Sequence, residues 1–378
     1  MLFDIKNITN ITKADLQALI DNQIFENREL EYKNYSFAGG KLQDKQKAKL
    51  MKEIAAFANT NGGTIIIGMQ EDEDHLPTKL CGAGMGIGDF DSWLSSFKEL
   101  VLSRIRPHLH GVDCVPVEVG DDNIAIVVSV PKSYARPHSF WDGNKDEFFM
   151  RHVNGIMYMD IDDLRKEFLC TNGLQDKIRD FRRDRISLIL ANECVGNLGN
   201  LAKLVLHIVP EWSFELGNTV ELKRFAENRT VRPLSGSGWD HRYNADGYCI
   251  FASDSSTGLI KTYLQFFRSG IIEATEIRCI SGYHDKVVRN WRLLQQGFIP
   301  IIADYGELLE ELKIPKPWHI SATLLNAKGY VTDTGWGTSL PIERDIVNSL
   351  EGICSEEILL QTAVEQVFQS ISNAFGFA

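Results

Sequence analysis

The residues best suited to chemistry are a few carboxylates and one lysine near the start of the chain. Glu31 and Lys33 form an E-x-K pattern, Glu26 lies five residues upstream, and Glu71 and Asp72 follow the apolar run at 64–69. If the two segments are neighbouring strands, these side chains converge. Carboxylate oxygens suit Mg²⁺ or Mn²⁺, which activate water and neutralise charge on a phosphodiester. A lysine beside the ion can hold the phosphate. One interpretation of the pattern is therefore a metal-dependent site that cleaves phosphodiesters.

The same E-x-K pattern has a second interpretation. Such spacing arises by chance in a charged chain, where it marks a solvated strand face with ion pairs. The alternation of a strand puts Glu29, Glu31 and Lys33 on one face and Leu30 and Tyr32 on the other. The spacing by itself leaves both interpretations open.

A helix and a strand must position these residues. Residues 44–60 are predicted to form a helix that ends at the 59–63 segment, where a glycine suits a left-handed cap. The strand at 64–69 has no polar alternation, so we expect it to be central and covered on both faces. The apolar stripe of the helix consists of Leu50, Ile54, Phe57 and Ala58.

The rest of the first half alternates between helices, strands and loops. Thr12 and Asp15 predict the capped start of a helix. The expected helices cover 11–24, 92–106 and 160–169, the strands 28–33, 112–119, 123–130 and 148–153, and the loops 34–43 (with Gly39-Gly40), 70–92 and 131–146.

Basic residues gather on the 44–60 helix. Lys45, Lys47, Lys49 and Lys52 could contact a phosphate backbone, or they could form a solvated helix face. Lys33 and Lys41 extend the basic region, and the run at 177–185 has the same two interpretations.

The length of 378 residues favours two domains. We expect the first at 1–172, ending at Thr171-Asn172-Gly173, and the second at 175–378.

Residues 177–185 start a helix or a linker. Strands are expected at 201–210, 259–267, 271–278 and 318–326, a hairpin after the 235–248 loop, and helices at 220–227, 285–297 and 356–372. The pattern predicts an α+β fold, with a mixed sheet and helices in the first domain and a second α+β domain.

Composition limits the class of protein. The N-terminus has no apolar segment typical of a signal peptide, and no apolar run approaches a membrane span, so we expect a cytoplasmic protein without membrane contact. The seven scattered cysteines predict reduced thiols rather than a zinc site. The net charge of −11 argues against a general nucleic-acid coat protein, but not against an enzyme with a local basic groove.

Three stretches carry a resemblance to a known family. ENRELEYK (26–33), AFANTNGGTIIIGMQEDE (56–73) and EFFMRHVNGIMYMDIDDLRKEF (147–168) occur in this order. Over about residues 10–170 the chain resembles the Schlafen-type AlbA domain, with a single N-terminal lobe as in bacterial Schlafen-like proteins.

The resemblance implies a metal-dependent endoribonuclease that acts on tRNA or other structured RNA, with a role in phage defence. It implies that Glu26, Glu31 and Glu71 hold Mg²⁺ or Mn²⁺, with Asp72 in place of Glu71 if the register differs by one. Lys33 would contact the phosphate. The alternative from another class is a non-catalytic regulator that binds DNA or RNA with the same domain.

The expected nucleic-acid contacts are Lys45, Lys49, Lys52 and Arg151. For Arg151 we leave open whether it contacts phosphate or pairs with an internal acid. Animal Schlafen cores carry two lobes and a zinc site, whereas this chain shows one lobe, so a full clamp requires a homodimer or larger homo-oligomer. The second half matches no function that we can name, and a third interpretation is an effector whose second domain senses a ligand or a phage protein.

Other features have simpler interpretations. The Gly82–Gly88 run lacks the lysine of a phosphate-binding loop and predicts a flexible loop. His138 and His152 are either structural or general bases, and Asn59 and Thr60 are either capping residues or site neighbours. The 235–248 segment is expected to be a surface loop, and the final helix to pack in the core or at a dimer contact.

Overall fold

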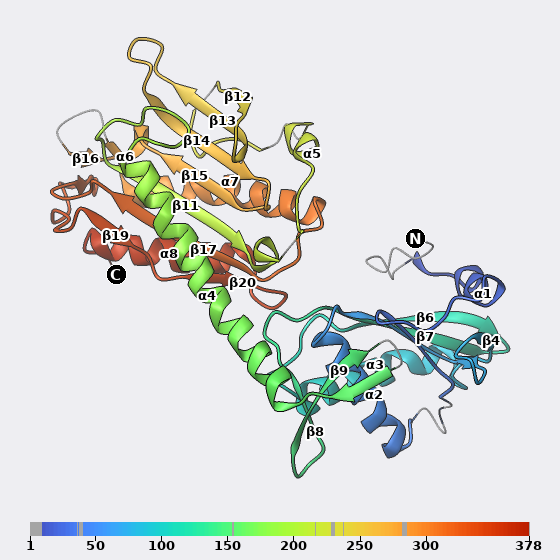
Figure 1. Ribbon diagram of the computed structural model, residues 1–378. Helices are drawn as coiled ribbons and strands as arrows, with labels where there is room; N and C mark the ends of the chain where they lie inside the picture. Colours follow the sequence, from blue (N-terminus) through green and yellow to red (C-terminus); the bar gives the residue numbers. More distant parts are fainter. Residues whose placement is uncertain are drawn as a thin grey trace. The chain divides into compact units, whose positions relative to one another are not determined.

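The computed structural model describes residues 10–35, 37, 41–152, 155–215, 217–227, 231–236, 238–281 and 286–377. The expected glycine loop at Gly39-Gly40 lies outside these residues. The chain divides into two compact units, Met1–Asn172 and Gly173–Ala378. Both units mix helices with sheets, so the α+β class predicted from the sequence is confirmed (Figure 1).

A four-stranded sheet forms the centre of the first unit. Its order is β1-β2-β7-β6, with β1 parallel to β2 and the other pairs antiparallel. On β2, Ile65 and Ile67 pack into one apolar cluster and Ile66 into another, so this strand is covered on both faces as predicted. The strands are β1 (Leu30–Lys33), β2 (Gly63–Ile67), β6 (Asp113–Gly120) and β7 (Asn123–Val130).

Helices cover the two faces of this sheet. On one face α2 (Asp44–Ala58) and α3 (Ile87–Arg104) share a cluster with Ile65 and Ile67. On the other face lies α1 (Lys13–Asp21), whose predicted Thr12–Asp15 capping box is present. Burying an apolar stripe in this way is the main stabilisation of such helices.

A second, smaller sheet packs beside α2. Its order is β10-β9-β8-β5, and all its pairs are antiparallel. β9 contacts α2, and Arg151 near the end of β9 reaches Glu31 of β1. The strands are β5 (Ile105–Arg106), β8 (Ser139–Trp141), β9 (Asp146–His152) and β10 (Gly155–Tyr158).

The prediction of a loop over 70–92 is wrong. The antiparallel hairpin of β3 (Met69–Glu71) and β4 (Pro77–Leu80) occupies its first part, and α3 begins at Ile87. The strands are too short and polar to show the alternation that marks a strand in sequence. The glycine-rich 82–86 connection is ordered, because Asn123 accepts a hydrogen bond from the Gly84 amide and donates one to the Cys81 carbonyl.

The helix expected over 160–169 is longer in the structure, although the two units divide between Asn172 and Gly173. Helix α4 runs without interruption from Ile161 to Leu190. A glycine inside a helix costs about 1 kcal/mol, but ion pairs three residues apart and burial of Ile178 and Ile189 offset this cost. The pairs are Asp162–Arg165, Asp176–Arg179 and Asp180–Arg183.

An eight-stranded antiparallel sheet forms the second unit. Its order is β12-β13-β14-β15-β11-β17-β19, and β20 also pairs with β17. The strands are β11 (Lys203–Pro210), β12 (Asp240–Tyr243), β13 (Gly247–Ser253), β14 (Ile260–Phe267), β15 (Ile272–Glu276), β17 (Trp318–Leu325), β19 (Ile346–Asn348) and β20 (Gly352–Cys354); β16 (Val287–Val288) pairs with β18 (Val331–Thr332) separately.

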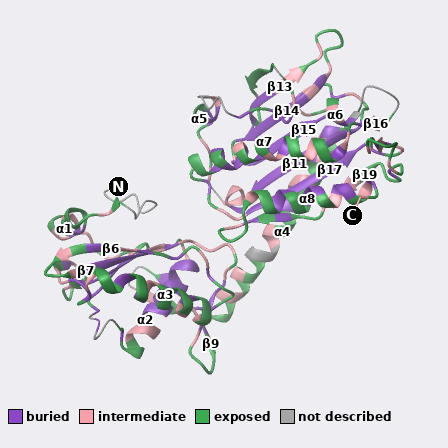
Figure 2. Ribbon diagram, turned by 180° about the vertical axis from the view of Figure 1, so that it is seen from behind, coloured by how far each residue is buried: buried purple, intermediate pink, exposed green. Residues whose placement is uncertain are grey.

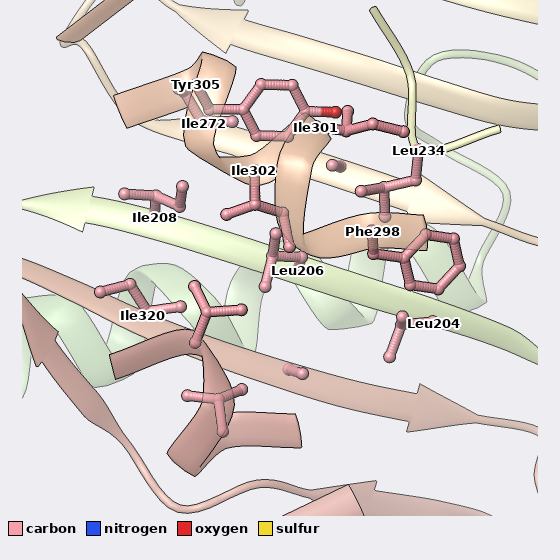
Figure 3. Packing of buried hydrophobic residues seen from close by; sticks show 14 of the residues in the cluster. Leu204, Leu206, Ile208, Leu234, Ile272, Phe298, Ile301, Ile302, Tyr305 and Ile320 are labelled. Carbon is pink, nitrogen blue, oxygen red and sulfur yellow. The ribbon is translucent and has the colours of Figure 1, made fainter. Parts of the chain in front are cut away.

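Two long helices cover one face of this sheet. The α7 side chains Ile302 and Tyr305 pack on Leu206 of β11 and its neighbours (Figure 3). The final helix contributes Val367, so its predicted core packing is confirmed. The central strands of the sheet are buried, whereas the outer sides of the helices are exposed (Figure 2). The helices are α7 (Trp291–Glu311) and α8 (Leu360–Ala374), with shorter turns at α5 (Leu222–Glu227), α6 (Arg278–Ser281) and η2 (Glu211–Phe214).

Buried charged groups occupy the opposite face of the same sheet. His319 of β17 lies with Nε2 2.7 Å from Glu211 Oε1 and Nδ1 3.3 Å from Glu351 Oε1. Although burial lowers the pKa of His319, the hydrogen bond to Glu211 and the nearby carboxylate of Glu351 outweigh it and raise the pKa to about 9. Nearby, Arg185 of α4 donates two hydrogen bonds to the buried Glu273.

Candidate metal centre and nucleic-acid interface

Three potential metal ligands meet beside the end of the central sheet. Glu26, Glu71 and His75 each offer a ligand atom, and these atoms lie within 4.8 Å of one another. His75 Nδ1 lies 3.5 Å from Glu26 Oε2 and 3.3 Å from Glu71 Oε2. Two of the three predicted carboxylates are therefore together, with a histidine that sequence reasoning missed.

Glu26 is held in place by the start of β1. Its Oε1 accepts a hydrogen bond of 2.6 Å from the Tyr32 amide, and the Tyr32 hydroxyl donates to the Ile24 carbonyl. The amide bond fixes one carboxylate oxygen of Glu26, and the other oxygen faces His75.

The β3–β4 hairpin positions the other two members. Asp72 Oδ1 accepts hydrogen bonds from the amides of Asp74 (2.9 Å) and Leu76 (3.0 Å), which fixes the turn. His75 adopts a φ of 61° in this turn. Of the two alternatives for the third carboxylate, Glu71 faces Glu26, whereas Asp72 shapes the backbone.

The surroundings of Glu26 disfavour the negatively charged form of its carboxyl group. Burial and the nearby charge of Glu31 raise the pKa of Glu26 to about 7, and Glu71 adds to the effect; the Tyr32 amide and Lys33 oppose it. A bound cation would stabilise both carboxylates in their charged form. Two carboxylate oxygens and one imidazole nitrogen are a donor set that fits Mn²⁺, and also Mg²⁺ with more water ligands.

A buried ionic network lies behind this group. Arg151 of β9 donates from Nη1 to Glu31 Oε2 (2.6 Å) and to Glu53 Oε2 (3.0 Å), and from Nη2 to the Asn27 carbonyl (2.7 Å). Lys33 pairs with Glu31 and lies 4.0 Å from Glu53. All four charged side chains are less than 8% exposed. Two carboxylates (Glu31 and Glu53) thus pair with two cations (Lys33 and Arg151), and these side chains come from β1, α2 and β9.

This network changes the roles of three predicted site residues. Both carboxylate oxygens of Glu31 already meet a cation, so Glu31 lies outside the group formed by Glu26 and Glu71. Lys33 is 6% and Arg151 2% exposed. Their burial does not support a direct contact with a phosphate at the surface, because each would have to leave a buried carboxylate unpaired. The solvated strand face considered from the spacing is wrong for the same reason.

Sequence reasoning missed Glu53 and His75. The sequence contains a sign that Glu53 is buried, because this residue lies on the same helix face as Leu50 and Phe57 and interrupts an apolar stripe. Burial and the charge of Glu31 raise the pKa of Glu53, although Lys33 and other cations oppose this. His75 had no signal, because its position depends on a hairpin that the sequence does not reveal.

The lysines of α2 do not form one uniform surface. Lys45 and Lys49 are exposed and make no ion pair with a described carboxylate. Lys52 differs, because its Nζ lies 2.8 Å from Glu147 Oε2 and 4.9 Å from the centre of the Phe149 ring. We therefore retain Lys45 and Lys49 as candidate phosphate contacts and assign Lys52 to packing of α2 against β9.

The end of α2 is connected by hydrogen bonds to His138 and to β9. Asn59 donates to the carbonyls of His138 and Phe149 and accepts from the His138 amide. Both ring nitrogens of the buried His138 have partners, and burial lowers its pKa, so a general-base role is not supported. Gly63 is required here, because a Cβ would lie 2.4 Å from the Phe57 ring.

Comparisons with known proteins agree with part of this description. Residues 26–160 match the family model described as Schlafen, AlbA_2. None of the curated proteins matches. The crystal structure of the DIP2311 protein from Corynebacterium diphtheriae is 15% identical over 39% of this chain, with a TM-score of 0.27. The matched part spans 26% of that protein, and so slight a likeness supports no statement about function.

Proposed function

Because residues 26–160 form a Schlafen-type AlbA domain, we propose that this protein is a metal-dependent endoribonuclease. The family suggests a nuclease-like or nucleic-acid-binding role. The observation that carries the finer proposal is the convergence of Glu26, Glu71 and His75 within 4.8 Å. A protein that only binds nucleic acid has no need of this group.

The proposed metal ligands are Glu26, Glu71 and His75. A divalent ion bound there would neutralise charge on the scissile phosphodiester and lower the pKa of a bound water. The chain's own part is to fix the ligands. The Tyr32 amide orients Glu26, and the Asp72 turn orients Glu71 and His75.

The other predicted residues support the site in different ways. Arg151 and Lys33 pair with Glu31 and Glu53 beside the metal ligands, which keeps β1, α2 and β9 together. Lys45 and Lys49 would contact the phosphate backbone from the surface of α2, so binding should weaken as salt rises. The choice of tRNA or other structured RNA as substrate rests on the resemblance to Schlafen nucleases, as does a role in phage defence.

A cleavage assay with matched variants tests the proposal. Labelled tRNA, single-stranded RNA and DNA are incubated with the full chain in Mn²⁺, Mg²⁺ or chelator. Glu71→Gln should reduce cleavage at least about 100-fold but leave RNA binding intact. Glu73→Gln, which removes an exposed carboxylate from the same hairpin, should behave as wild type. Cleavage by wild type in chelator, or equal cleavage by both variants, would contradict the proposal.

The alternative is a non-catalytic regulator that binds DNA or RNA. It is favoured by the exposure of Lys45 and Lys49. Binding without cleavage in every metal, together with loss of binding in Lys45→Glu/Lys49→Glu, would support it. The single AlbA domain also leads us to propose a homodimer, which a monomeric mass in light scattering would contradict.

A further inference from the structure

A groove of about 410 Å³ lies between α2 and α3, and none of the proposed metal ligands lines it. One wall is the start of α2 with the residues just before it, and the other is a face of α3. Its lining consists of Lys41, Leu42, Lys47, Leu50, Asp89, Ser92, Trp93, Ser96, Phe97 and Leu100.

The floor of the groove is apolar and aromatic. Trp93 and Phe97 stack with ring centres 4.9 Å apart and an angle of 22° between the rings. Phe37 packs against Trp93 edge to face, with ring centres 5.6 Å apart. These rings are held from several sides, so the floor is a firm surface that suits a planar apolar ligand group.

The rim carries charge of both signs. Lys41 is exposed and makes no ion pair with a described carboxylate. Lys47 Nζ lies 3.1 Å from Asp44 Oδ1, but that carboxylate is exposed and the pair is easily exchanged. Asp89, in the first turn of α3, is the carboxylate of the lining.

We propose that this groove binds one nucleotide. The base would lie on the floor formed by Leu50, Trp93 and Phe97. Lys41 and Lys47 would hold the phosphate, and Asp89 would accept a hydrogen bond from an N–H of the base. The volume lies at the lower end of the range typical of small-molecule sites, about 300–1,000 Å³.

The nucleotide can come from two sources, a free nucleotide or an unpaired residue of a nucleic-acid strand. Both present the same base and phosphate. The proposal goes beyond the nuclease function and needs none of its metal ligands, so binding is measured without metal and also in Glu71→Gln.

Calorimetry on the full chain tests the groove. The ligands are AMP, CMP, GMP, UMP, inorganic phosphate and a short single-stranded oligonucleotide. Ser96→Trp should fill the groove, because Ser96 is an exposed part of its lining whose hydroxyl bonds only to the Ser92 carbonyl among described groups. Ser95→Trp places the same side chain beside the groove as a control. Lys41→Ala/Lys47→Ala tests the phosphate contact, and thermal unfolding checks that each variant folds.

We expect saturable nucleotide binding that weakens at least about tenfold in Ser96→Trp and in the lysine variant, but not in Ser95→Trp or Glu71→Gln. If only the oligonucleotide shows this pattern, the groove takes a residue of a strand; if mononucleotides show it, the groove takes the free ligand. Absence of binding by both, equal effects of the two tryptophan variants, or phosphate binding as tightly as nucleotides would overturn the proposal. If Glu71→Gln loses nuclease activity but binds nucleotides as tightly as wild type, the groove acts independently of the proposed metal site.

Discussion

His75 is the residue that gives the proposed centre its chemical character. Imidazole nitrogen suits transition metals, whereas Mg²⁺ prefers oxygen ligands and keeps much of its water. The Glu26–Glu71–His75 group should therefore bind Mn²⁺ more tightly than Mg²⁺.

Removing the imidazole nitrogen of His75 should reduce the preference of the site for Mn²⁺ over Mg²⁺. We expect His75→Asn to lower Mn²⁺ affinity about tenfold and to change Mg²⁺ affinity much less. Electron paramagnetic resonance of free Mn²⁺ measures the first, and competition by Mg²⁺ the second. The exposed His152→Asn is the matched control. Equal losses for both metals would show that His75 only shapes the turn.

Among elements, the Glu31–Lys33–Glu53–Arg151 network holds β1, α2 and β9 together. Arg151→Met would leave Glu31 and Glu53 buried with one cation between them. Breaking a buried pair in this way costs about 3–5 kcal/mol of unfolding free energy. Urea unfolding should show this loss.

The exposed Arg165, which pairs with Asp162 on α4, provides the comparison. Arg165→Met should change the unfolding free energy by less than about 1 kcal/mol. If the two variants have equal effects, the buried network does not stabilise the unit.

Helix α4 supports a second prediction about an element. A Cβ added at Gly173 meets no atom within 4 Å, and its φ lies outside the left-handed region. Gly173→Ala should therefore raise the unfolding free energy by about 0.5–1 kcal/mol. Gly217, whose φ is +87°, should respond in the opposite direction to the same substitution. A lower melting temperature for Gly173→Ala would contradict a continuous helix at this position.

The sequence predicted those elements whose signals are local. The Thr12–Asp15 capping box, the stripe on α2 and the uninterrupted apolar β2 all follow from propensity and period. The β3–β4 hairpin did not, because three- and four-residue strands lack a period. Glu26 and Glu71 were named from the chain, but the exclusion of Glu31 from their group depends on Arg151, which is 120 residues away from it in sequence.

At the scale of the whole molecule, the described part of the chain contains no helix that is both long and apolar enough to span a bilayer. The family model covers residues 26–160, and in the second unit the described residues include several buried charged groups. His319 with Glu211 and Glu351 is the group that should make stability depend on pH.

The sign of this dependence follows from the direction of the shift. The pKa of His319 is raised from 6.5 to about 9 in the folded chain. Its contribution is therefore fully present below pH 6.5 and is lost as pH rises through 9, up to about 3 kcal/mol. Urea unfolding at pH 6.5 and 9.5 should show this loss in wild type and a smaller loss in His319→Gln. His241→Gln, at an exposed position, should keep the wild-type dependence, and identical pH slopes in all three would contradict the assignment.

The neutrality of the Glu31–Lys33–Glu53–Arg151 network has a consequence for how related sequences can diverge. A single change of charge at one of these positions leaves an unbalanced charge in the protein interior, whereas a paired change restores the balance. Relatives that lose Arg151 should therefore also lose Glu31 or Glu53, and such paired changes would be visible as covariation between positions about 100 residues apart in sequence. A deep alignment of AlbA_2 domains would reveal this linkage without any experiment on the protein itself.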